Sequence, residues 1–163
     1  MSYRYFIKIS FDGTHYNGWQ VQKNSVSVQQ KIDESLSTIF NSTIKTLGAS
    51  RTDTGVHAKQ NFAHFEINTK LPENFIFRMN TILPKDIGIK KIILVDNDAH
   101  ARFDAIERSY EYRICFGKNV FMNDFTYLLN KNIFDLKILN TAAQLLFNYK
   151  DFSAFSKSKT QVK

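Results

Sequence analysis

The sequence predicts an α+β protein, because strands with alternating side chains and two amphipathic helices follow one another in a distinctive order. Residues 3–11 place Tyr5, Ile7, Ile9 and Phe11 on one face and more polar side chains on the other, which is typical of a half-buried strand. Three further short strands are predicted at residues 44–49, 61–67 and 89–95.

Two helices are predicted between these strands. Ser27 and Gln30 form a capping box before the first helix, which we expect to end near Asn41. Pro72 is suited to the first position of the second helix, and Pro84 ends it. Apolar residues recur at helical spacing in both segments, namely Val28, Ile32, Leu36 and Ile39 in the first and Phe75, Met79 and Ile82 in the second.

Strand, helix, strand, strand, helix, strand is the element order of a ferredoxin-like βαββαβ domain with an antiparallel sheet. We assign this domain to residues 1–103. A strand at residues 109–116 and a helix at about residues 134–147 then resemble the start of a second, similar domain, which residues 104–163 leave incomplete. The first domain is therefore expected to bury its own core.

The second domain is expected to lack partners for part of its apolar surface. With one strand and one helix it leaves a sheet edge unpaired and Phe116, Leu145 and Leu146 without neighbours. The chain after about Tyr149, including the basic residues 157–163, is expected to be poorly ordered or bound to a neighbouring copy of the chain.

The composition suits a protein that binds a polyanion. The net charge is +7, from 22 Lys and Arg residues against 15 Asp and Glu residues, and most of the positive residues are scattered along the chain. The same charge is compatible with a basic protein that binds no nucleic acid. Cys115 is the only cysteine and the four histidines have no zinc-ligand spacing, so neither a disulfide nor a metal site is predicted.

The sequence contains no stretch of transmembrane length, and its N-terminal residues lack the apolar core of a signal peptide. We therefore expect a cytoplasmic protein with no membrane partner.

Residues 48–58, with the sequence GASRTDTGVHA, leave a short apolar strand and enter a polar segment. Arg51 and Asp53 are two residues apart, so in an extended chain both point to the same face, and the guanidinium favours an ionised, nucleophilic carboxylate. Gly55 permits a positive φ or a close approach of ligand, and His57 is a candidate contact to phosphate or base. An isolated Arg-x-Asp is more often an ion pair that holds a loop.

The whole segment is more specific than such a pair, because it resembles the signature G-x-[GS]-R-T-D-x-G-V-H-A of the tRNA pseudouridine synthase A family. Further segments resemble motifs of that family and follow in the family's order. They are residues 11–22 (Y-D-G-x-x-Y-x-G-W-Q-x-Q), 80–87 (N-x-x-L-P-x-D-I), 100–105 (H-A-R-F-x-A), 108–112 (R-x-Y-x-Y) and 151–155 (D-F-x-x-F).

The resemblance implies a cofactor-free isomerase that converts uridine to pseudouridine in the tRNA anticodon stem-loop, at the positions that the family numbers 38 to 40. Asp53 matches the family's essential aspartate, Arg51 the arginine thought to pair with it, and Tyr110 the tyrosine that stacks on the target uracil. The family also implies a homodimer. Without the resemblance, Tyr110 would be assigned to the core together with the other residues of its strand.

The expected contacts to the substrate come from three regions of the chain. They are Thr52, Gly55 and His57 in the signature, Trp19 and Gln20 in the first motif, and Arg102 between the two domains. Trp19 and Tyr16 are equally compatible with facing RNA and with closing their own loop. His64, opposite the apolar face of its strand, is expected to be a structural histidine.

The sequence departs from the family in length, since family members are longer and carry a His, Met and Arg-rich motif that is absent here. One alternative is therefore a non-catalytic module that binds RNA stem-loops. Another is an aspartic protease, because residues 53–55 read Asp-Thr-Gly. In aspartic proteases two aspartates share a proton, and the neighbouring Arg51 would oppose such sharing by Asp53.

Overall fold

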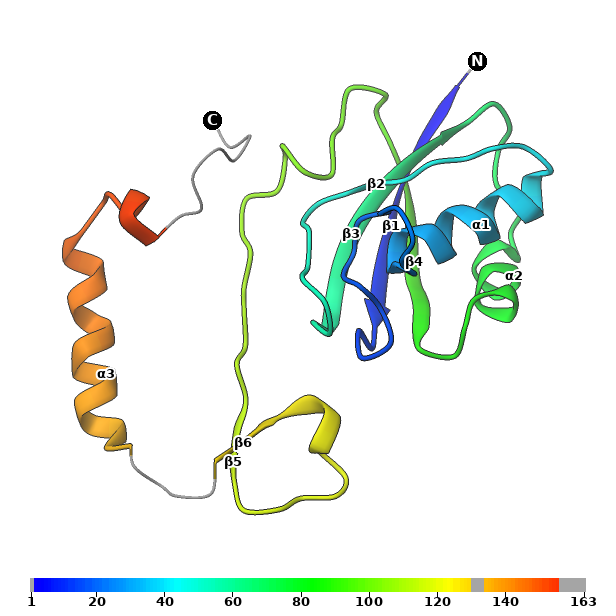
Figure 1. Ribbon diagram of the computed structural model, residues 1–163. Coiled ribbons are helices and arrows are strands. Elements are labelled where there is room, and N and C mark those ends of the chain that lie inside the picture. Colours follow the sequence, from blue (N-terminus) through cyan, green and yellow to red (C-terminus); the bar gives the residue numbers. More distant parts are fainter. Residues whose placement is uncertain (1, 130–133, 156–163) are drawn as a thin grey trace. The chain divides into compact units, whose positions relative to one another are not determined.

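The structure, a computed structural model, describes residues 2–129 and 134–155 (Figure 1). Its contacts divide the chain into one compact unit of Met1–Glu111 and a second unit of Tyr112–Lys163. The first unit thus extends beyond residue 103, the domain boundary expected from the sequence. The basic residues 157–163 lie outside the described residues.

The first unit contains a four-stranded sheet in which every neighbouring pair of strands is antiparallel. Its strands are β1 (Tyr3–Phe11), β2 (Leu47–Gly48), β3 (Ala58–Ile67) and β4 (Ile87–Val95). Their spatial order, β2-β3-β1-β4, is that of a ferredoxin-like split βαβ unit. The predicted α+β class is therefore confirmed.

Two helices, α1 (Val28–Phe40) and α2 (Phe75–Ile82), cover the same face of this sheet (Figure 1). The core between them combines the inward side chains of β1 and β3 with one stripe of each helix. As predicted, the Ser27 hydroxyl accepts a hydrogen bond from the Gln30 amide, and α1 ends with Asn41 in the left-handed conformation.

The boundaries of four elements of the first unit differ from the prediction. Strand β3 starts at Ala58 and β4 at Ile87, earlier than residues 61 and 89. Pro72 precedes α2 instead of starting it, because the Phe75 amide closes a turn onto the Pro72 carbonyl at 3.0 Å. Strand β2 is shorter than residues 44–49, because the amides of Ile44 and Thr46 bond to side chains of α1 and not to a neighbouring strand.

The second unit has a short parallel pair, β5 (Ile114–Phe116) and β6 (Tyr127–Leu129), and a helix, α3 (Leu136–Leu145). Three short 3-10 turns accompany them, at Asn123–Phe125, Leu146–Asn148 and Ser153–Phe155. The strand is shorter than residues 109–116, and α3 starts later than residue 134, because the Asp135 side chain caps it.

None of the described residues of this second unit is buried. The three residues expected to lack neighbours agree with this, since Phe116, Leu145 and Leu146 are 47%, 57% and 52% exposed. The apolar side chains of the unit thus find no core of their own in the described part of the chain.

The carboxyl of Asp33 on α1 makes the stability of the first unit depend on pH, and the direction of this dependence follows from its pKa. Burial raises the pKa of its carboxyl to about 6, although hydrogen bonds from the Thr46 amide and hydroxyl act in the opposite direction. The folded chain therefore binds this proton more tightly than the unfolded chain. The resulting stabilisation is present below the pKa of an unfolded aspartate and is lost as the pH rises through about 6.

We expect Asp33→Asn, which keeps an acceptor for Thr46 and removes the charge, to gain stability relative to the unsubstituted chain as the pH rises from about 4 to about 7. Thermal unfolding followed by circular dichroism across this range measures the difference. Glu34→Gln on the same helix is the control. Hydrogen bonding to Lys31 lowers the pKa of Glu34, so the stability that its carboxylate contributes changes with pH in the opposite direction. A pH-independent difference for Asp33→Asn would contradict the expectation.

Candidate active site

Two loops at one end of the sheet carry most of the residues singled out from the sequence. The first follows β1 and runs through residues 12–27 to α1, and the second joins β2 to β3 through residues 49–57. Phe11 at the end of β1 pairs with Ala58 at the start of β3, so the strand register brings the two loops side by side.

Backbone hydrogen bonds join the two loops directly. The Trp19 amide donates to the Thr52 carbonyl at 3.1 Å, and the Gly55 amide donates to the Tyr16 carbonyl at 3.2 Å. Gly55 has a φ of +76°, a conformation that glycine adopts at little cost. These bonds hold the backbone on both sides of Asp53.

Two glycines of the first loop allow this close approach. A Cβ on Gly13 would lie 2.1 Å from the Val56 carbonyl oxygen, and one on Gly18 would lie 2.3 Å from the Thr52 carbonyl oxygen. Since both obstacles are backbone atoms of the second loop, a side chain at either glycine would push the loops apart.

Asp53 and Arg51 are both exposed, whereas the hydroxyl of Thr52 between them is buried without a hydrogen-bond partner in the described structure. The alternation places Arg51 and Asp53 toward solvent, as the spacing predicted. Within the part of the chain that is described, no ion pair forms between them. Their carboxylate and guanidinium are thus accessible to a substrate.

His57 connects the second loop to the first. Its Nδ1 lies 3.1 Å from the Gly13 amide and 2.9 Å from Asp12 Oδ1. Burial would raise the pKa of Asp12, but the hydrogen bonds from Thr14 and the nearby imidazole together lower it. The ring of His57 therefore helps to hold the loops together, and its contact to RNA stays a prediction.

Trp19 and Tyr16 lie beneath the loops. They are 2% and 5% exposed, and a Cβ on Gly48 would lie 2.4 Å from the Trp19 Nε1. The Tyr16 hydroxyl donates to Asp86 Oδ1 at 2.6 Å; burial and this carboxylate raise the pKa of Tyr16. The burial favours the loop-closing alternative for both rings. Gln20, the next residue, is exposed.

Tyr110 is 80% exposed, so it does not belong to the core. Interactions on both sides of it hold its segment against the sheet. Arg108 Nη2 donates to the Ala49 carbonyl at 3.1 Å, and Glu111 forms an ion pair with Lys59. Because Ala49 and Lys59 stand at the two ends of the Asp53 loop, these contacts bring Tyr110 to the same region of the first unit.

The sequence did not single out Arg108 or Glu111 as positioning residues. The R-x-Y-x-Y spacing includes both of them, since they flank Tyr110. Their partners, Ala49 in the loop after β2 and Lys59 on β3, are however evident only in the folded chain.

The segment around Arg102 lies on the sheet face opposite the helices. His64 on β3 is 3% exposed and its Nδ1 accepts a hydrogen bond from the Ala101 amide at 3.2 Å, which confirms the structural histidine. Burial and the neighbouring His100 lower the pKa of His64. Arg102 itself is half-buried, with its guanidinium 5.7 Å from the centre of the Phe103 ring.

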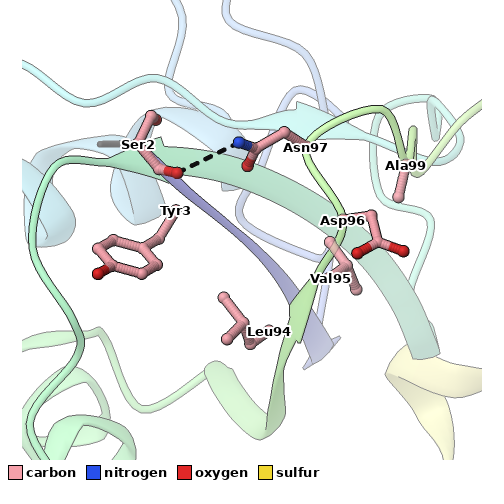
Figure 2. A pocket seen from close by; sticks show the side chains of 7 residues that line it. All are labelled: Ser2, Tyr3, Leu94, Val95, Asp96, Asn97 and Ala99. Atoms are coloured by element: carbon pink, nitrogen blue, oxygen red, sulfur yellow. Dashed lines mark hydrogen bonds between the residues drawn. The ribbon is translucent and has the colours of Figure 1, made fainter.

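A hollow of about 760 Å³ lies away from these loops (Figure 2). Tyr3, Leu94 and Asp96 are among its lining residues, and the Asn97 side chain donates to the Ser2 carbonyl there at 3.3 Å. Tyr3 begins β1, whereas the Asp53 loop lies beyond the other end of that strand. The hollow is therefore no part of the candidate active site.

The described residues include no group of three or more His, Cys, Asp or Glu side chains that could hold a metal ion. In that same part of the chain, no helix has the length and apolar character needed to cross a membrane.

Comparison with known proteins identifies the family. Residues 7–104, which include both loops, match the family described as tRNA pseudouridine synthase. The chain belongs to this family. Curated relatives named tRNA pseudouridine synthase A agree: the proteins of Bacteroides fragilis and Porphyromonas gingivalis are each 42% identical over 98% of the chain, and that of Staphylococcus carnosus is 33% identical over 98%.

The chain is shorter than these relatives of its family. It spans 64% of the Bacteroides fragilis and Porphyromonas gingivalis proteins and 60% of the Staphylococcus carnosus protein.

The close approach of the two loops can be tested at two glycines with positive φ. Gly18→Ala should destabilise the fold by more than the roughly 1–2 kcal/mol that a left-handed alanine costs, because its Cβ also meets the Thr52 carbonyl. Gly55→Ala is the matched control, since it has a similar φ but no atom within 4 Å of its Cβ. Urea unfolding gives both values, and equal losses would show that the close approach carries no cost.

Proposed function

We propose that the complete protein isomerises uridine to pseudouridine in tRNA, with Asp53 as its catalytic carboxylate. The observation that carries the proposal is the exposed Asp53 on a loop whose backbone is held on both sides by hydrogen bonds. Membership of the tRNA pseudouridine synthase family supports it. A rigidly held but accessible carboxylate suits nucleophilic or electrostatic catalysis.

The reaction breaks the C1′–N1 bond of the target uridine and forms a C1′–C5 bond. The C5 proton is lost from the base and N1 takes up a proton, so the composition is unchanged. Asp53 attacks the substrate or stabilises the detached sugar. Bonds are exchanged within one nucleotide without net oxidation or transfer to another molecule, so the proposal requires neither cofactor nor metal.

Arg51 and Tyr110 have complementary roles in this proposal. A stacked base must leave its stack before a carboxylate reaches its sugar, at a cost of a few kcal/mol. The exposed Tyr110 ring offers a new stacking surface, worth on the order of 1–3 kcal/mol, and can assist proton removal from C5. Arg51 pairs with Asp53 and helps to displace the base once the substrate excludes water from the site.

The proposed substrate site is the anticodon stem-loop of tRNA, at the positions that the family numbers 38 to 40. The net charge of +7 supports binding to phosphate. Closer contacts come from Gly55, His57, Gln20 and Arg102, which are exposed or half-buried. Thr52, whose hydroxyl is buried, contributes through its backbone, which holds the loop to Trp19. Trp19 acts in this proposal by supporting the loop from below. A cytoplasmic homodimer is proposed as the working form.

A second candidate function is a module that binds RNA stem-loops without turnover. The observation in its favour is the second unit, whose described residues include no buried side chain. Catalysis by Asp53 requires that water be excluded from the reacting sugar, because water weakens the electrostatic stabilisation.

We expect Asp53→Asn in the complete protein to abolish pseudouridine formation and to leave tRNA affinity within a few-fold, because the amide keeps the shape but is no anionic nucleophile. Tritium release from C5-labelled uridine measures turnover, and filter binding measures affinity. Asp98→Asn, an exposed aspartate after β4, is the control and should remain active. Substantial turnover by Asp53→Asn would end the assignment.

The two candidate functions differ in the activity expected of a chain extended to the length of the relatives. We expect residues 1–163 to bind tRNA but to turn over at or near background, and the extended chain to be active. The same tritium assay on both chains decides the question. Full activity of residues 1–163 would show that an uncovered second unit is no obstacle to catalysis, whereas an inactive extended chain would favour the binding module.

A further inference from the structure

Polar side chains on α1 connect the first loop of the candidate active site to Thr46, the residue that precedes β2. Gln29 Nε2 donates to the Thr46 carbonyl at 2.6 Å, and Gln29 Oε1 accepts from the Val21 amide at 3.2 Å. Asp33 lies one helical turn later, on the same face of α1. Its Oδ1 accepts from the amide and the hydroxyl of Thr46 at 2.9 and 2.7 Å.

The side-chain amide of Gln29 fits only one orientation. Val21 offers a donor and Thr46 an acceptor, so the oxygen must face Val21 and the nitrogen must face Thr46. Thr46 is 1% exposed, so water does not readily replace a partner that is lost there. Gln29 thus connects the two segments as a bridge of fixed length.

The first segment held by Gln29 leads to the backbone beside Asp53. Val21 follows Trp19 by two residues. The backbone amide of Gln29 also donates a hydrogen bond to the Trp19 carbonyl, at 3.0 Å. The Trp19 amide in turn donates to the Thr52 carbonyl at 3.1 Å. A shift of this segment would therefore move the residue before Asp53.

The second segment leads to the same loop through β2. Thr46 immediately precedes β2, and Gly48 at the end of β2 lies directly against the Trp19 indole. The Ala49 amide then donates to the Phe62 carbonyl at 2.7 Å, after which the loop begins. Gln29 therefore contacts both the residue that precedes β2, the strand that enters the Asp53 loop, and the segment that supports the loop from below.

We propose that Gln29 is a positioning residue for Asp53, and that Asp33 provides a second hold on Thr46. The side chain of Gln29 sets the distance between the Trp19–Val21 segment and β2, and so fixes where the loop presents the carboxylate. The catalytic part of this inference rests on the proposed function.

The test is Gln29→Met in the complete protein, because methionine has a similar length and forms neither hydrogen bond. We expect kcat to fall by about a hundred-fold, the loss typical of a reacting group misplaced by about 1 Å, with KM for tRNA changed by less than about threefold. Trp19 is the only tryptophan of residues 1–163, so its quenching by acrylamide, measured in this chain, reports independently on the support of the loop and should increase. Gln30→Met is the matched control, since the Gln30 side chain bonds to Glu34 on the helix surface.

An unchanged kcat in folded Gln29→Met would overturn the positioning role, whatever the quenching shows. Should that variant not fold, Gln29→Glu replaces it, because it keeps the acceptor for Val21 and turns a carboxylate oxygen toward the Thr46 carbonyl. Failure of both variants to fold would also overturn the proposal, since the amide would then be required for the fold itself. If the unsubstituted protein forms no pseudouridine, the proposed function fails, and the quenching of Trp19 alone decides whether Gln29 holds the Trp19–Val21 segment to Thr46.

Discussion

The pairing of β1 with β3 is the constraint on which the candidate active site depends. Its register places Phe11 opposite Ala58, so the chain leaves β1 and enters β3 at the same end of the sheet. The loops that begin and end there must share one space. Glycines make this possible, because Gly13 and Gly18 leave room for backbone carbonyls where a side chain would collide.

Sharing that space gives the loops a rigidity that their exposed position alone would not provide. Loops at a protein surface are ordinarily mobile, since their backbone groups can bond to water. Here the amides of Trp19 and Gly55 bond to the partner loop, and the buried Trp19 indole lies beneath Gly48. Asp53 is therefore exposed on a backbone that the core supports, which combines access for a substrate with a defined position.

The two units of the chain differ in how much of their own apolar surface they bury. The first unit encloses a continuous core between its sheet and two helices. The second has a helix with an apolar stripe and two three-residue strands, but no described residue of it is buried. A parallel pair of such short strands cannot form an independent core. The loop that carries Asp53 lies wholly in the first unit, which encloses its own core.

Local patterns in the sequence determined the class of the fold, the face of each strand and helix, and the segment that carries Asp53. Alternation and helical spacing act over a few residues, so β1 and α1 were predicted with their observed starts at Tyr3 and Val28. Only the tertiary structure decided that β2 shortens to two residues and that Gln29 joins the first loop to the residue before β2. These outcomes depend on hydrogen bonds between segments far apart in the chain, and no pattern of neighbouring residues encodes which distant partner a polar group finds.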